Sequence, residues 1–112
     1  MYRLSVLYGM PTDQKAFDEY YWTKHLNIAK TRNGVQFWSV TVLDPGLNGE
    51  PPPYYCVADM YFESRSDLEA MVQSEAGKAS REDVTNFATG GVTFLYGEEQ
   101  VISDLRGGSN RA

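Results

Sequence analysis

The chain has very few of the residues that build metal sites and disulfide frameworks. Its 112 residues include one cysteine, Cys56, and one histidine, His25. A single cysteine excludes an internal disulfide and a cysteine-based zinc cluster, and a single histidine excludes a multi-histidine metal site. The sequence also lacks a Gly-x-Gly-x-x-Gly or P-loop pattern after a predicted strand, and a Gly-x-Ser-x-Gly nucleophile elbow. We therefore expect no bound metal and no nucleotide or nicotinamide cofactor.

Long apolar runs and excess positive charge are missing as well. The apolar stretch from Leu4 to Met10 is too short for a signal peptide or a membrane span. Ten Lys and Arg against fifteen Asp and Glu give a net charge of −5, which argues against nucleic acid or an anionic membrane as the main partner. We expect a cytoplasmic protein in which Cys56 is a reduced, inert core thiol.

Aromatic residues, by contrast, are abundant. Eight Tyr, five Phe and two Trp stand in a chain whose length suits one small domain. Aromatic side chains bring large buried areas, and they line cores, interfaces and pockets for planar ligands.

The hydrophobic pattern predicts alternating strands and helices. Alternation of apolar residues predicts strands over 2–8, 35–43, 54–62 and 92–96. Spacings of three and four predict a helix from Thr12 or Asp13 to about Asn33, and a second helical region from Ser66 to Ala88, interrupted near Gly77. Ser66 with Glu69, and Ser80 with Asp83, have the spacing of capping boxes, so we expect Ser66 and Ser80 to cap the two parts of this region. A short fifth strand over 100–105 stays open. We expect residues 1–105 to form one domain and residues 106–112 a flexible tail.

This order, β-α-β-β-α-β, is typical of the ferredoxin-like α+β fold, with helices on one face of a four-stranded antiparallel sheet. Both faces of the predicted strands carry bulky apolar residues, so a monomer leaves one aromatic face in water. Two sheets packed face to face solve this problem, and we expect a homodimer. The alternative is a monomer whose open face is merely rich in tyrosine.

Four stretches of the chain are distinctive. They lie at 7–13, 17–25, 58–62 and 74–93, and the run Asn86-Phe87-Ala88-Thr89-Gly90-Gly91 is the most specific. In these stretches the chain resembles the EthD family, named for a protein linked to ethyl tert-butyl ether breakdown. The resemblance implies a dimeric α+β barrel. Some members carry the label "EthD family reductase", and others in the wider superfamily act as cofactor-free monooxygenases, dehydratases or decarboxylases on aromatic polyketides, or bind haem.

Two residues are candidates for catalysis. His25 titrates near neutral pH and shares a helical face with Tyr21 and Ile28, so it is the first candidate general acid or base. Asp59 lies in the middle of a strand, on the face that the alternation also assigns to Tyr55 and Tyr61. A carboxylate there needs a partner such as a tyrosine hydroxyl, an arginine or His25. Either residue could instead be purely structural.

Several aromatic residues are candidates for a ligand pocket. They are Tyr8, Tyr21, Trp38, Tyr55 and Tyr61, with core or interface packing as the alternative for each. Asp83 fits a helix-capping position, and Phe87 is expected in the core.

Three functions remain open. The first is a cofactor-independent oxidoreductase or lyase that acts on a hydrophobic or aromatic small molecule, with His25 moving a proton. The second is a non-catalytic protein that binds such a molecule for a degradative or biosynthetic oxidation pathway. The third is a haem protein with His25 as the axial ligand.

Overall fold

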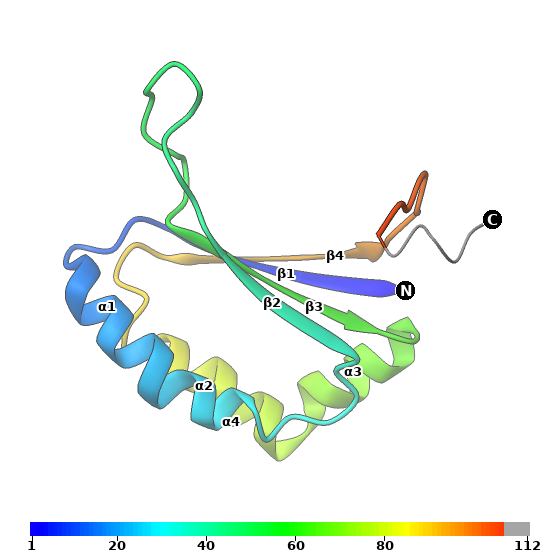
Figure 1. Cartoon of the computed structure of the whole chain (residues 1–112). Coiled ribbons are helices and arrows are strands. Elements are labelled where there is room, and N and C mark those ends of the chain that lie inside the picture. The colour runs from blue at the N-terminus through cyan, green and yellow to red at the C-terminus, as the bar shows by residue number, and fades with distance from the viewer. Residues whose placement is uncertain (107–112) are drawn as a thin grey trace.

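The computed structural model of the chain describes residues 1–106 (Figure 1). In this part of the chain, the helices lie on one side of a single twisted sheet, and the other side carries no helix. The elements in chain order are β1 (Tyr2–Tyr8), α1 (Gln14–Tyr20), a π-helical turn η1 (Tyr21–His25), α2 (Leu26–Ala29), β2 (Phe37–Val42), β3 (Cys56–Phe62), α3 (Arg65–Gln73), α4 (Glu75–Val84) and β4 (Val92–Glu98).

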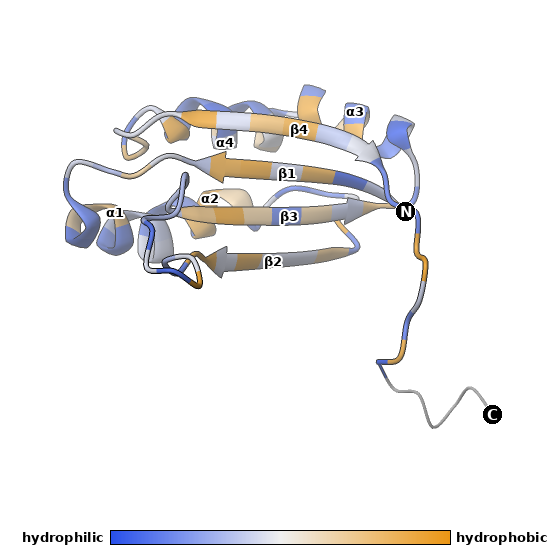
Figure 2. Cartoon of the chain, turned by 90° about the horizontal axis from the view of Figure 1, so that it is seen from above, coloured by the Kyte–Doolittle hydropathy of each residue, from blue (hydrophilic) through white to orange (hydrophobic). Residues whose placement is uncertain are grey.

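The sheet has the strand order β2-β3-β1-β4, and all three pairings are antiparallel. This arrangement confirms the ferredoxin-like α+β fold. Even-numbered residues of the strands face the helices, so Leu4, Ala58 and Met60 are buried there. Odd-numbered residues face the open side of the sheet, which Figure 2 views from above.

The first helical segment forms because an acidic cap starts it and an aromatic stripe holds it to the sheet. The Asp13 carboxylate accepts a hydrogen bond from the Ala16 amide at 3.0 Å, as the sequence predicts. Phe17, Tyr21 and His25 form the buried face of this segment. The turn that holds Tyr21 and His25 is π-helical, a local widening that occurs frequently at functional sites.

The second helical region is divided at Ser74 instead of Gly77. The Ser74 side chain caps α4 by accepting from the Gly77 amide at 3.1 Å, and its hydroxyl donates to the Met71 carbonyl at 2.6 Å. The expected caps at Ser66 and Ser80 are wrong, because Ser64 caps α3 and Ser80 lies inside α4. A serine with an acidic residue three positions later also occurs inside helices, so that pattern alone placed the caps too late.

The strand boundaries need smaller corrections. β2 and β3 each begin two residues later than expected, and β4 continues to Glu98. Within residues 1–106, the segment 100–105 contains no strand, so the possible fifth strand is wrong. Most of the expected tail, residues 107–112, lies outside the described part of the chain.

Within residues 1–106, no helix has the length and apolar character needed to cross a membrane. Cys56 is buried in β3, and its burial raises the pKa of the thiol to about 12. The thiol therefore stays protonated near neutral pH, which fits the expectation of an inert core residue.

Candidate functional site

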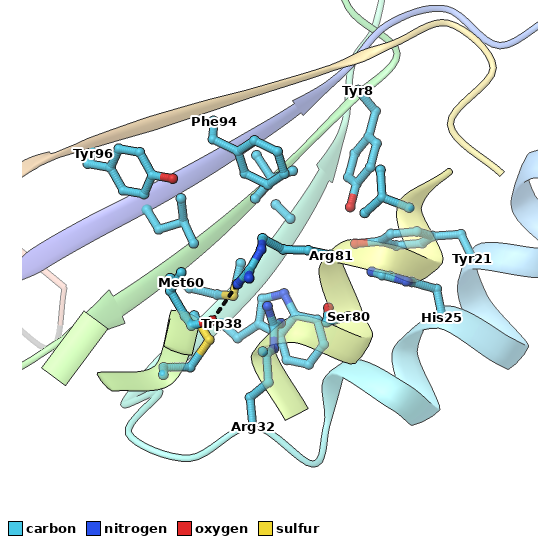
Figure 3. A pocket seen from close by; sticks show the side chains of 17 residues that line it. Tyr8, Tyr21, His25, Arg32, Trp38, Met60, Ser80, Arg81, Phe94 and Tyr96 are labelled. Atoms are coloured by element: carbon cyan, nitrogen blue, oxygen red, sulfur yellow. Dashed lines mark hydrogen bonds between the residues drawn. The ribbon is translucent and has the colours of Figure 1, made fainter. Parts of the chain in front are cut away.

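His25 lies at the end of η1 and is almost fully buried, with 4% of its surface exposed. Its ring stacks on Tyr21, with centroids 5.4 Å apart, and lies 4.6 Å from the ring of Phe87. These two contacts fix the plane of the imidazole. One edge of the ring then meets α4 and the other faces a cavity (Figure 3).

The partner of His25 is Asp83, a buried residue near the end of α4. His25 Nδ1 and Asp83 Oδ2 are 2.9 Å apart. The other carboxylate oxygen of Asp83 accepts hydrogen bonds from the Tyr20 hydroxyl at 2.6 Å and from Asn86 Nδ2 at 3.0 Å. Three donors thus converge on one buried carboxylate, which holds it in the ionised form.

The pKa shifts of the pair follow from burial and from these hydrogen bonds. Burial lowers the pKa of His25 below its usual 6.5, and this effect outweighs the opposing hydrogen bond and charge of Asp83. Burial alone would raise the pKa of Asp83, but the bonds from Tyr20, His25 and Asn86 together leave it lowered. Near neutral pH the pair is therefore a neutral imidazole beside a carboxylate. Because a carboxylate only accepts, Nδ1 carries the proton and Nε2 is left as a proton acceptor.

A cavity of about 40 Å³ lies between the sheet and the helices, next to His25. This volume holds roughly three water molecules. Tyr8, Tyr21 and Trp38, three of the predicted pocket residues, line it together with His25. Arg81 also lines it, and this side chain is solvent-exposed with Nη1 donating to the Val72 carbonyl.

Among residues 1–106, two buried polar atoms of this cavity find no hydrogen-bond partner. They are the Tyr21 hydroxyl, on a residue that is 1% exposed, and the indole Nε1 of Trp38. A buried donor left unpaired costs about 1–3 kcal/mol, so such atoms are unusual in a folded chain. Burial raises the pKa of Tyr8 and of Tyr21, and both phenols therefore remain protonated.

Arg32 is a further residue of the cavity, and the sequence reasoning missed it. Its Nε donates to the Ala29 carbonyl at 2.9 Å, and its guanidinium lies over the Trp38 ring, 5.1 Å from the centroid. Burial lowers the pKa of Arg32. An arginine just after a helix is common, so its position gave no signal of a site.

Asp59 and Tyr61 lie on the opposite face of the sheet from His25. The Asp59 carboxylate pairs with Arg3, at 2.9 Å from Nη2, and accepts from the Ser5 hydroxyl. The Tyr61 hydroxyl donates to Glu99 at 2.8 Å. The structure therefore does not bring Asp59 to His25, because strand alternation directs it to the open face.

Tyr55 and Asp83 also occupy places that the sequence did not indicate. Tyr55 precedes β3 and turns toward the helices, where its hydroxyl donates to Asp18 at 2.8 Å, so the expectation that it shares a strand face with Asp59 is wrong. Asp83 does not cap a helix but lies inside α4, where its carboxylate accepts a hydrogen bond from His25. His25 and Asp83 are 58 positions apart in the sequence, so their pairing depends on how α4 packs against η1.

The run from Asn86 to Gly91 builds the back of this site. Asn86 holds Asp83, and Phe87 packs on His25. Gly90 lies so close to the end of β1 that a Cβ atom there would meet the Met10 carbonyl at 2.2 Å, and Gly91 has φ +91°. The small residues let β4 begin beside β1 while Phe87 stays under the imidazole.

The described residues do not favour a bound metal or haem. Within residues 1–106, no three His, Cys, Asp or Glu side chains are grouped so as to hold a metal ion. A porphyrin is several times larger than the cavity beside His25 and does not fit between the sheet and the helices as they stand.

Known proteins are similar to this chain in sequence and in fold. The EthD domain family matches residues 10–91. An "uncharacterized 11.0 kDa protein in thcB-thcC intergenic region" of Rhodococcus erythropolis is 37% identical over 102 residues, which cover 91% of this chain and 98% of that protein.

Two crystal structures are informative. An ethyl tert-butyl ether D (EthD) family protein of Bacillus halodurans C-125 is 32% identical and has a TM-score of 0.83, covering 89% of this chain and 99% of that one. A DABB family protein with a ferredoxin-like fold from Mesorhizobium loti is 10% identical and has a TM-score of 0.71, covering 89% and 97%. The second likeness concerns the fold alone. The family match and the sequence identities to the first two proteins lead to one conclusion: the chain belongs to the EthD family.

Proposed function

We propose that the chain binds a hydrophobic or aromatic small molecule in the cavity beside His25 and uses His25 as a base to move a proton of that molecule. The reaction class is that of a cofactor-independent oxidoreductase or a lyase. One observation carries this proposal: a buried, neutral imidazole is held by an ionised carboxylate on Nδ1 and turns its other edge toward a cavity.

The pair has the parts of a base and its orienting group. Asp83 fixes the tautomer of His25 and stabilises the imidazolium that forms when Nε2 takes a proton. The aromatic walls formed by Tyr8, Tyr21 and Trp38 suit a flat apolar ligand, and burial keeps water away from the reacting carbon. The cavity of about 40 Å³ is smaller than such a ligand, so binding also requires side chains that line it, Arg81 among them, to move apart.

Proton transfer can be tested without knowledge of the natural substrate. Wild-type protein is incubated in D₂O with small aromatic ketones such as acetophenone and 2-tetralone, and NMR follows the entry of deuterium beside the carbonyl. We expect faster exchange with the wild type than with buffer, and no acceleration with His25→Gln. Oxygen consumption, measured in parallel, separates an oxidase-like reaction from a lyase. Equal acceleration by His25→Gln would contradict a role for the imidazole.

A non-catalytic binding protein is the second candidate. The unpaired Tyr21 hydroxyl and Trp38 Nε1 favour it, because a bound ligand would satisfy both whether or not a reaction follows. Native mass spectrometry of freshly purified protein distinguishes the candidates. A small-molecule adduct that is released unchanged, together with no deuterium exchange, would favour binding alone.

We also propose that two copies of the chain pair through the open face of the sheet. This face bears the exposed side chains of Phe37 and Leu95, 57% and 52% accessible. The charges of Arg3 and Asp59 neutralise each other in the middle of the face. Arg3 also lies 3.9 Å from a carboxylate oxygen of Glu99, so the charges at this face are partly compensated, and its exposed apolar side chains favour pairing with a second copy.

Sedimentation equilibrium tests the pairing. We expect a dimer for the wild type and a folded monomer for Phe37→Glu, because a charge would be buried in the interface. Ala70→Glu, which places the same charge on the exposed side of α3, should remain dimeric. A monomeric wild type would end the proposal.

A further inference from the structure

The polar groups of the cavity share one character. Tyr21, Trp38 and the two arginines Arg32 and Arg81 present hydrogen-bond donors to it, and among residues 1–106 no acidic side chain lines it. We propose that the ligand of this cavity carries an anionic oxygen on an apolar ring, and that the Arg32 guanidinium, the Trp38 indole N–H and the Tyr21 hydroxyl receive it. The inference rests on the proposed binding function and names the chemical class of the ligand.

The unpaired donors call for an acceptor. An indole N–H can only donate, so an apolar wall or a second donor cannot satisfy Trp38. The Tyr21 hydroxyl is held in place by its ring, which packs between Tyr8 and His25. Both atoms are therefore fixed before a ligand arrives, as a site that recognises an oxygen requires.

Arg32 supplies the positive charge. Within residues 1–106, neither of the two cavity arginines, Arg32 and Arg81, forms an ion pair with an acidic side chain, whereas Arg3 and Arg65 each do. Arg81 is solvent-exposed and donates to the Val72 carbonyl, so we assign the charge to the less exposed Arg32. Its Nε is occupied by the Ala29 carbonyl, so the charged end is held beside the Trp38 ring with its remaining N–H groups available. A guanidinium binds anionic oxygens well. Its planar set of N–H donors can bond both oxygens of a carboxylate, or can donate to the single oxygen of a phenolate.

The location of this charge complements His25. When Nε2 of His25 takes a proton from a phenol or from the carbon beside a carbonyl, the electron pair left behind moves onto the ligand oxygen. The proton ends on the imidazole, and the oxygen becomes a phenolate or an enolate. Arg32, Trp38 and Tyr21 would stabilise that charge more strongly than the neutral ground state, which is the condition for faster proton removal. A carboxylate would be received by the same donors without proton transfer.

Two probes distinguish these sources of the anion. The first is 4-nitrophenol, whose phenolate absorbs visible light. The second is 2-naphthoate, a carboxylate that is already an anion at neutral pH. We expect wild-type protein to bind at least one of them. Binding of 4-nitrophenol with added phenolate absorbance assigns an oxyanion formed in the site, and binding of 2-naphthoate alone assigns a carboxylate ligand. Either result supports the proposal. The neutral 4-nitroanisole and methyl 2-naphthoate should bind more weakly.

The variants test each donor. Arg32→Gln should weaken binding of the anion by about tenfold or more, and Tyr21→Phe and Trp38→Phe by about fivefold each. Arg32→Lys should retain part of the affinity, and Arg65→Gln, on the exposed face of α3, should retain all of it. Thermal unfolding of every variant confirms that the fold is kept.

Two results would overturn the inference. One is binding of the anion by Arg32→Gln as tight as by the wild type, and the other is binding of the neutral analogues as tight as of the anions. If the wild-type protein binds neither 4-nitrophenol nor 2-naphthoate, the inference is also overturned. The test is separate from that of the proton-transfer reaction, because affinity is measured by titration. An anion that binds to a protein without deuterium exchange would leave this inference standing and contradict only the catalytic role of His25.

Discussion

The carboxylate of Asp83 lies 2.9 Å from Nδ1 of His25, and both side chains are more than nine-tenths buried. The pair joins η1 to α4 on the cavity side of the sheet. Its geometry leads to predictions about protonation, packing and stability that do not require a known substrate.

Stability should fall in mild acid because of His25. Burial lowers its pKa in the folded chain below the 6.5 of the unfolded chain, so the unfolded state takes up a proton first as the pH drops. This contribution to the free energy of unfolding is complete above pH 6.5 and is lost as the pH falls to the folded pKa, at about 1.4 kcal/mol per pH unit. Urea unfolding between pH 7.5 and 4.5 measures it. His25→Gln should lack this slope, and an identical slope in the variant would contradict the assignment.

The pKa of His25 should decrease further in Asp83→Asn. The substitution removes the negative charge and the carboxylate acceptor, both of which oppose the effect of burial. The chain has a single histidine, so its ring proton gives one resolved NMR titration curve. Asp44→Asn, in an exposed loop, serves as the control and should leave the curve unchanged. A rise in the pKa would show that Asp83 does not stabilise the imidazolium.

Phe87 should be among the most costly side chains to truncate. Its ring contacts Tyr8, Phe17, Tyr20, Tyr21 and His25. Phe87→Ala should lower the free energy of unfolding by about 3–5 kcal/mol, because it leaves a cavity among these rings. Leu47→Ala, on a fully exposed loop residue, should change it by less than about 0.5 kcal/mol. Equal effects in denaturant titrations would argue against this packing.

Two glycines should respond in opposite ways to alanine. A Cβ atom at Gly77 would lie 2.0 Å from the Met71 carbonyl oxygen, so Gly77→Ala must push α3 and α4 apart at Ser74. We expect a loss of about 1–3 kcal/mol by thermal or chemical unfolding. At Gly97, in β4, a Cβ atom meets nothing within 4 Å, and Gly97→Ala should be neutral or slightly stabilising. A stable Gly77→Ala variant would show that the approach of α3 to α4 is not tight.

Local sequence patterns were sufficient to predict most elements of the fold. Alternation in the strands and the three-to-four spacing from Phe17 to His25 depend only on which residues lie near one another in sequence, and they placed four strands, the start of the first helix and the Asp13 cap. The expected end of that helix near Asn33 is wrong, because the helical segment ends at Ala29. The same patterns put Ser80 and Tyr55 in the wrong setting, because their roles depend on contacts with other elements.

The candidate site divides in the same way. The sequence alone singled out His25, as the only imidazole, and the aromatic residues Tyr8, Tyr21 and Trp38. It named Asp59 as a possible partner of His25 and gave Asp83 a helix-capping position, since each is one acidic residue in a regular element. Only the packing of α4 on η1 brought Asp83 to the imidazole, and only the pleat of the sheet turned Asp59 to the opposite face. The sequence by itself determined which chemical groups the protein has and which elements carry them; the tertiary structure decided which groups meet, because such meetings depend on contacts across 58 residues that no local pattern encodes.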